Sequence, residues 1–197
     1  MDVSTSLIPN KAKHRIGSDP HGKRGPMIES SLSMLADVAF GADREMAISL
    51  ETFGKRGEFD FASQDWTNLP GDGVSSASEI KSLVSKGLEV NNDDPKYKGT
   101  DWLQGLDFAK ESLNARKYKI QNAGGQSCQV LIWVTDGVPD PNGVMGDASS
   151  ERWREAAEAN KKDFPVICKG NDPLVDWFRS HKVLILGALL EPEKEDL

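Results

Sequence analysis

Oxygen-bearing side chains occur in three short stretches of this sequence, in types and spacings that suit a divalent cation. Near the start, Asp2, Ser4 and Ser6 form the pattern D-x-S-x-S. Thr100 precedes an amphipathic segment, and Asp136 lies in a Thr-Asp-Gly tripeptide after an apolar run. Mg²⁺ is a small hard ion that prefers six oxygen ligands at about 2.1 Å. Any one stretch is also typical of turns and helix caps, so the inference depends on their combination.

The elements that must position these side chains can be read from the spacing of apolar residues. Helices alternating with apolar strands predict an α/β doubly wound sheet, in which ligands bind beyond the carboxyl ends of the strands. Stripes at steps of three and four predict helices, and nearly continuous apolar runs predict buried parallel strands. We expect helices at 27–40, 76–88, 100–117 and 150–162, strands at 129–134 and 182–190, and a hairpin of 46–53 with 59–62.

Capping residues sharpen the expected helix starts. Ser76 with Glu79 three residues later forms a capping box, and Asp172 with Pro173 forms an N-cap and first-turn pair. Thr100 is expected to open the third helix. These boundaries place the stretches 2–6, 99–102 and 135–140 at one edge of the predicted sheet.

The three stretches together resemble the metal-ion-dependent adhesion site (MIDAS) of von Willebrand factor type A (vWA) domains, a family that includes integrin inserted domains and many bacterial proteins. The resemblance implies that Ser4, Ser6 and Thr100 bind Mg²⁺ or Mn²⁺ directly, and that Asp2 and Asp136 act through water. It also implies that a protein ligand offers a Glu or Asp carboxylate to the open position of the cation. Three neutral hydroxyl ligands leave the cation electron-poor, which favours such an anionic oxygen.

The resemblance implies one three-layer, Rossmann-like vWA domain over 1–197, with sheet order 3-2-1-4-5-6. Only Met1 precedes Asp2, so we expect a fragment that lacks the first central strand and the last helix. Residues 9–26 are expected to form an inserted basic loop, and 191–197 a charged tail. A secreted or cell-surface location is favoured over a cytoplasmic one, since any signal segment would precede the missing strand.

The basic loop has two interpretations. Residues 11–24 contain one acidic side chain and five basic ones: Lys11, Lys13, Arg15, Lys23 and Arg24. The loop either steers an acidic partner toward the metal or is simply a solvated, mobile segment.

Composition limits the class of protein. The 197 residues include 24 basic and 31 acidic side chains, a formal net charge of −7, and 38% of them are hydrophobic. These values are typical of a globular domain with a core, and they argue against a general nucleic-acid binder, which needs clustered cations. The longest apolar run, 183–190, is far shorter than the ~20 residues that span a bilayer. Cys128 and Cys168 are expected to be buried thiols, and whether they pair stays open.

We therefore expect a metal-dependent protein-binding module rather than an enzyme. The alternative is a Mg²⁺-dependent, phosphatase-like hydrolase that uses Asp136 and Asp140, although the spacing of these two residues departs from the usual D-x-D pattern. A scaffold with a vestigial or structural metal site is a third possibility.

Overall fold

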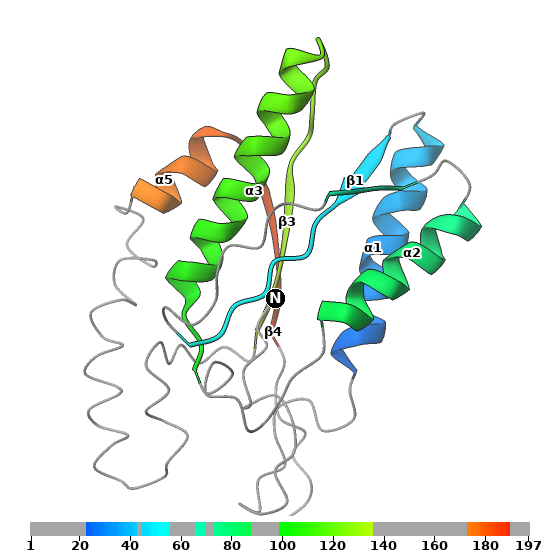
Figure 1. Cartoon of the computed structure of the whole chain (residues 1–197), viewed down its shortest axis with the longest axis horizontal. Helices are drawn as coiled ribbons and strands as arrows, with labels where there is room; N and C mark the ends of the chain where they lie inside the picture. Colours follow the sequence, from blue (N-terminus) through cyan, green and yellow to red (C-terminus); the bar gives the residue numbers. More distant parts are fainter. Residues whose placement is uncertain are drawn as a thin grey trace, which may run out of the picture.

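The computed structural model describes residues 23–42, 45–55, 66–69, 73–87, 99–135 and 173–189. Helices and two small sheets of mixed type make up this part of the chain, which is broadly α/β (Figure 1). In chain order the elements are α1 (Arg24–Gly41), β1 (Met46–Ile48), β2 (Thr67–Leu69), α2 (Gly73–Gly87), α3 (Trp102–Asn122), β3 (Val130–Thr135), α5 (Pro173–Ser180) and β4 (Leu184–Leu189).

The described strands form two separate pairs. β1 and β2 are antiparallel, with Met46 opposite Leu69 and Ile48 opposite Thr67. β3 and β4 are parallel, in a register that runs from Val130 opposite Leu184 to the ends of both strands. The two apolar runs form parallel strands, whereas a single doubly wound sheet stays a prediction. The expected burial of the second run is wrong, because Leu184, Ile185 and Leu186 of β4 are exposed.

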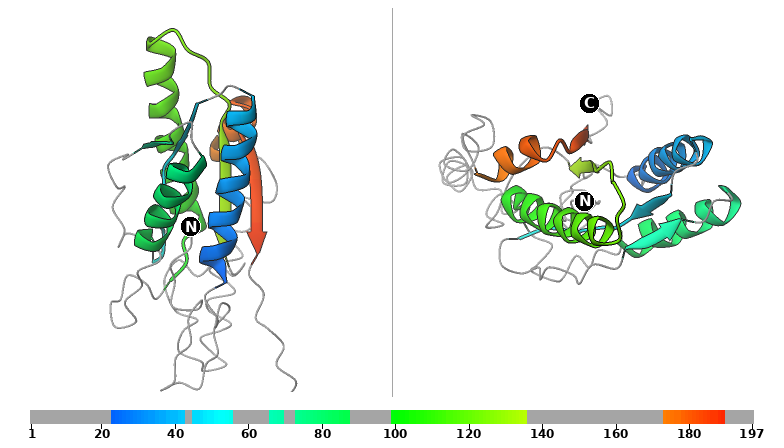
Figure 2. Two further views of the ribbon diagram at one scale, coloured as in Figure 1. Left: turned by 90° about the vertical axis from the view of Figure 1, so that its right-hand side faces the viewer. Right: turned by 90° about the horizontal axis from the view of Figure 1, so that it is seen from above.

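β3 packs against helices on both of its faces. Leu131 packs against a cluster built by α3 and α5, whereas Ile132 and Val134 belong to a cluster built largely by α1 and α2. Alternate residues of a strand point to opposite faces, so an all-apolar strand is what this two-sided packing requires. Figure 2 shows the two helix pairs on either side of β3 and β4.

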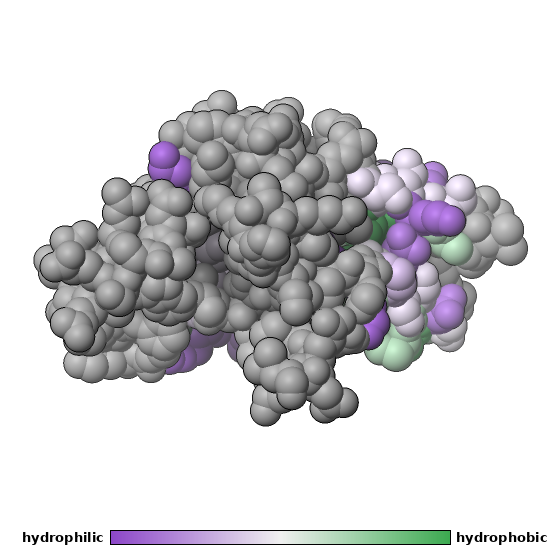
Figure 3. All heavy atoms as spheres, turned by 90° about the horizontal axis from the view of Figure 1, so that it is seen from below, coloured by the Kyte–Doolittle hydropathy of each residue, from purple (hydrophilic) through white to green (hydrophobic). Residues whose placement is uncertain are grey.

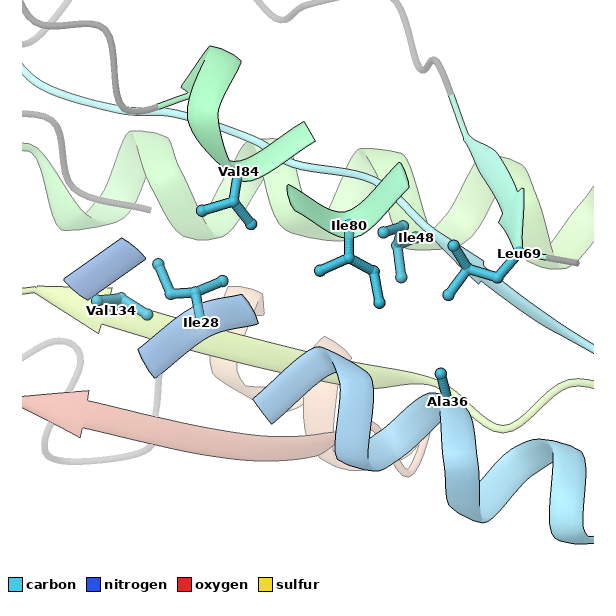
Figure 4. Packing of buried hydrophobic residues seen from close by; sticks show 7 residues of the cluster. All are labelled: Ile28, Ala36, Ile48, Leu69, Ile80, Val84 and Val134. Carbon is cyan, nitrogen blue, oxygen red and sulfur yellow. The ribbon is translucent and has the colours of Figure 1, made fainter. Parts of the chain in front are cut away.

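The larger cluster joins the first half of the chain to β3. Ile80 and Val84 of α2 are completely buried, one helical turn apart, and point toward Ile28 of α1 and Ile48 of β1 (Figure 4). The helical spacing of apolar residues in α1 and α2 is thereby explained, because these stripes face one shared core. The buried members are Ile28, Ala36, Ile48, Leu69, Ile80, Val84 and Val134.

The boundary of the expected basic loop at 9–26 is wrong at its end. α1 begins at Arg24, so the helix includes Pro26 in its first turn, where a missing backbone N–H costs nothing. Of the two basic residues of this loop that the structure describes, Lys23 is exposed and Arg24 is buried. Arg24 is therefore a helix residue and not part of a solvated loop. The other three cations of this segment lie outside the described residues.

Two further helix starts differ from expectation. α2 begins at Gly73, so Ser76 lies inside the helix and is not its N-cap. No proline lies between Gly73 and Ser76, so the helix can start three residues earlier than expected. α3 begins one residue after Asp101, which is its N-cap in place of Thr100. The same helix extends past the expected end at 117 to Asn122, where Gly124 takes the positive φ of 77° that favours glycine after a helix.

Several other expectations meet the structure only in part. The antiparallel partner of β1 is β2, because Leu69 reaches the shared core, while the expected partner 59–62 lies outside the described residues. The expected helix 150–162, Asp172 and Cys168 also lie outside them. Cys128 is exposed, in the segment between α3 and β3, so its expected burial is wrong. None of the described helices has the length and apolar character needed to cross a bilayer.

Candidate metal centre

The start of α3 and the end of β3 lie at the same end of the molecule. α3 and β3 run in opposite directions, so the start of α3 and the end of β3 both lie toward the lower end in Figure 1. Thr100 and Thr135 are exposed over only 2% and 3% of their surface. Seen from this end, the described residues at the surface present hydrophilic and hydrophobic side chains side by side (Figure 3).

The segment before α3 is held by Asp101. Asp101 Oδ1 accepts hydrogen bonds from the backbone N–H groups of Leu103 at 3.1 Å and Gln104 at 3.4 Å. These N–H groups have no partner within the helix, so a short acidic side chain at this position stabilises the helix start. Asp101 has an extended backbone and is 3% exposed. The preceding Thr100 is therefore attached to a fixed helix end.

A backbone hydrogen bond ties this segment to the chain that follows β1. The N–H of Asp101 donates to the carbonyl oxygen of Gly54 at 2.7 Å. The neighbouring Phe53, which is 1% exposed, stacks on Trp133 of β3, with ring centroids 4.6 Å apart and planes 15° apart. Trp102 meets the same Trp133 edge to face at 6.3 Å. Three segments distant in sequence thus converge beside Thr100.

Helix α3 approaches this aromatic stack closely through Gly105. A Cβ built on Gly105 would lie 2.6 Å from Phe53 Cδ1 and 2.9 Å from Trp133 Cη2. Carbon atoms normally pack at about 3.5 to 4.0 Å, so only glycine lets the helix lie this near. The close approach fixes where the first turn of α3 stands relative to β3.

The structure describes one of the five expected metal-binding residues. Thr100 lies directly before Asp101, the N-cap of α3, and is buried. Asp2, Ser4, Ser6 and Asp136 lie outside the described residues, as does Asp140. Asp136 directly follows the buried Thr135 at the end of β3. Hydroxyl and carboxylate oxygens are the ligands that Mg²⁺ and Mn²⁺ accept, so the donor set fits these ions. Within the described ranges, no group of three or more His, Cys, Asp or Glu side chains could hold a metal.

Sequence reasoning passed over Asp101 as a structural part of this site. Two signals were available, because aspartate is among the preferred N-cap residues and Asp101 directly precedes the apolar-periodic run of α3. Its bond to Gly54 had no such signal, since the two residues are distant in sequence.

One carboxyl near this region has a shifted pKa. Burial raises the pKa of Glu51 above its ordinary value of 4.5, and a hydrogen bond from the Ser49 hydroxyl, 3.1 Å away, opposes that shift only in part. Glu51 lies two residues before Phe53.

Comparison with known proteins adds no relative, since no family model, curated protein or solved structure matches the chain.

Proposed function

We propose that this chain is a vWA-type domain that binds an acidic protein ligand through a divalent cation. In this proposal Ser4, Ser6 and Thr100 hold Mg²⁺ or Mn²⁺ directly, and Asp2 and Asp136 hold it through water. The bound cation supplies an open coordination position for a carboxylate of the partner.

The placement of Thr100 is the observation that carries the proposal. Its buried position at the start of α3 lies at the same end of the molecule as the end of β3, which Asp136 follows directly. Two contacts join these chain segments: the hydrogen bond from Asp101 to Gly54, at 2.7 Å, and the stacking of Phe53 on Trp133, with ring centroids 4.6 Å apart. Parallel strands of α/β proteins present their ligand sites at such ends.

Metal binding is the first test. Mn²⁺ titration followed by electron paramagnetic resonance should show one site in the wild type. Thr100→Ala should weaken binding by at least about tenfold, since losing even an indirect partner of a metal ligand costs that much. The helix cap belongs to Asp101, so this variant should stay folded. Thr67→Ala is the matched control, because it removes a threonine hydroxyl from β2, outside the proposed site, and it should bind Mn²⁺ like the wild type. Equal affinity in all three proteins would refute the assignment of Thr100.

Two aspartate variants separate binding from hydrolysis. Asp136→Ala should weaken Mn²⁺ binding more than Asp140→Ala, because only Asp136 belongs to the proposed metal site. Equal losses at both positions, together with phosphatase activity in the wild type, would favour the hydrolase alternative.

Partner capture tests the remaining step. A protein ligand recovered from the native source in Mg²⁺ should be lost in EDTA, and Thr100→Ala should lose it in both conditions. A ligand retained equally in EDTA would exclude a metal-bridged contact.

A further inference from the structure

Asp101 makes hydrogen bonds through its side chain and through the N–H of the peptide group that joins it to Thr100. Its side chain accepts from the N–H groups of Leu103 and Gln104, and its own N–H donates to Gly54 at 2.7 Å. The first contact sets the backbone of Asp101 against the helix, and the second sets the plane of the Thr100–Asp101 peptide. Few rotations are left to the backbone on the helix side of Thr100.

The amide groups at the start of α3 are also already used. Leu103 and Gln104 donate to Asp101 Oδ1, and the N–H of Gly105 donates to the Asp101 carbonyl at 3.1 Å. An anion therefore finds no donor among these three groups. The helix start acts on its surroundings by holding Thr100, rather than by binding a ligand itself.

The contact partner of Asp101 lies next to a tightly packed aromatic side chain. Gly54 follows the buried Phe53, whose ring stacks on Trp133 and packs closely against Gly105 of α3. Because β3 carries Trp133, the position of Gly54 is set relative to the strand that leads to Asp136. The hydrogen bond from Asp101 to Gly54 thus aligns the Thr100 segment with the end of β3.

We propose that Asp101 is a positioning residue of the metal centre, which orients the Thr100 hydroxyl by capping α3 and anchoring the Thr100–Asp101 peptide to Gly54. The inference rests on the proposed function. The property that matters is a hydrogen-bond acceptor on a short side chain, not its negative charge. Asparagine and serine, the other favoured N-cap residues, should therefore serve in its place.

Mn²⁺ affinity of the full chain tests this role. Asp101→Ala should bind Mn²⁺ about 10- to 100-fold more weakly than the wild type, as is usual when a residue that orients a metal ligand is removed. Asp101→Asn and Asp101→Ser keep a cap acceptor and should bind within about threefold of the wild type. Near-ultraviolet circular dichroism confirms that each protein compared is folded.

A matched control separates positioning from stability. Ile80→Val trims a completely buried side chain of α2 and lowers the melting temperature without touching the start of α3. It should leave Mn²⁺ affinity unchanged, whereas a purely structural role of Asp101 would make Asp101→Ala behave in the same way.

The outcomes are distinguishable. Wild-type affinity in folded Asp101→Ala would overturn the positioning role and leave the metal site standing. Losses in Asp101→Asn and Asp101→Ser as large as in Asp101→Ala would overturn it too, by making the charge the decisive property. If Asp101→Ala does not fold, Asp101→Gly takes its place, because glycine is tolerated better than alanine at an N-cap, and wild-type Mn²⁺ affinity in that variant would overturn the positioning role. Absence of Mn²⁺ binding in the wild type would instead overturn the proposed function, and the inference with it.

Discussion

Replacing Gly105 by alanine tests how closely α3 must approach β3. The added methyl group would lie 2.6 and 2.7 Å from Phe53 Cδ1 and Cγ, and 2.9 Å from Trp133 Cη2. Two of these atoms belong to Phe53, which is 1% exposed and whose ring is stacked on Trp133 with the ring centroids 4.6 Å apart. Neither ring can turn away without breaking the stack, so the helix itself has to shift outward.

Two opposing terms decide the sign of the change. Alanine is favoured over glycine inside a helix by about 1 kcal/mol. Forcing an extra methyl group into a packed core costs about 1 to 3 kcal/mol. Contacts about 1 Å inside the normal range with three ring atoms place this site toward the upper end of that cost. We expect a net loss of about 1 to 2 kcal/mol in the free energy of unfolding.

Urea denaturation followed by tryptophan fluorescence measures this loss. Near-ultraviolet circular dichroism should change as well, because Trp102 and Trp133 both contact the displaced region. Gly41→Ala at the end of α1 is the control, since a Cβ there would meet nothing within 4 Å, and its stability should stay within about 0.5 kcal/mol of the wild type. Gly105→Ala more stable than the wild type by about 1 kcal/mol would show that helix propensity alone acts and would refute the close packing.

Three further predictions concern the core, a buried acid and the partner. Ile80→Ala should lower the free energy of unfolding by about 2 to 5 kcal/mol, because Ile80 is completely buried, whereas Met34→Ala at an exposed site should stay within about 0.5 kcal/mol. Folding raises the pKa of Glu51, so its contribution to stability is full below 4.5 and is lost as pH rises through the raised pKa. Glu51→Gln should therefore flatten the fall in melting temperature over that range, and an unchanged pH profile would contradict the assignment. Raising ionic strength should slow partner association in surface-binding kinetics if charges at 11–24 steer it, and an unaffected rate would favour the solvated-loop interpretation.

Local patterns in the sequence determined where most described elements lie. Apolar residues at helical steps predicted α1, α2 and α3, because each helix must bury one stripe whatever its neighbours are. Continuous apolar runs likewise predicted the strands β3 and β4, which pair in parallel. The run in β4 did not predict burial correctly, since Leu184, Ile185 and Leu186 are exposed. Helix ends were less accurate, since Ser76 and Thr100 both carry capping side chains, yet the helices begin at Gly73 and at Trp102. A capping residue permits a helix start without excluding one nearby.

The candidate site was predicted from sequence only in its parts. The type and order of its oxygen ligands predict a divalent cation, and of these ligands the structure describes Thr100, which is buried directly before Asp101 and α3. The role of Asp101 as the cap, and its bond to Gly54, depend on contacts between segments far apart in the chain.

The tertiary structure alone decided how the segments around α3 and β3 pack together. The pairing of β1 with β2, the stacking of Phe53 on Trp133 and the approach of Gly105 to both rings join segments whose separation in sequence carries no local signal. Hydrophobic periodicity says that a stripe must be buried, but it is equally satisfied by many partners. Only close packing in three dimensions selects among these partners. An extra methyl group in the core lowers the free energy of unfolding by about as much as the loss of a helix cap does, so a poorly fitting partner is excluded.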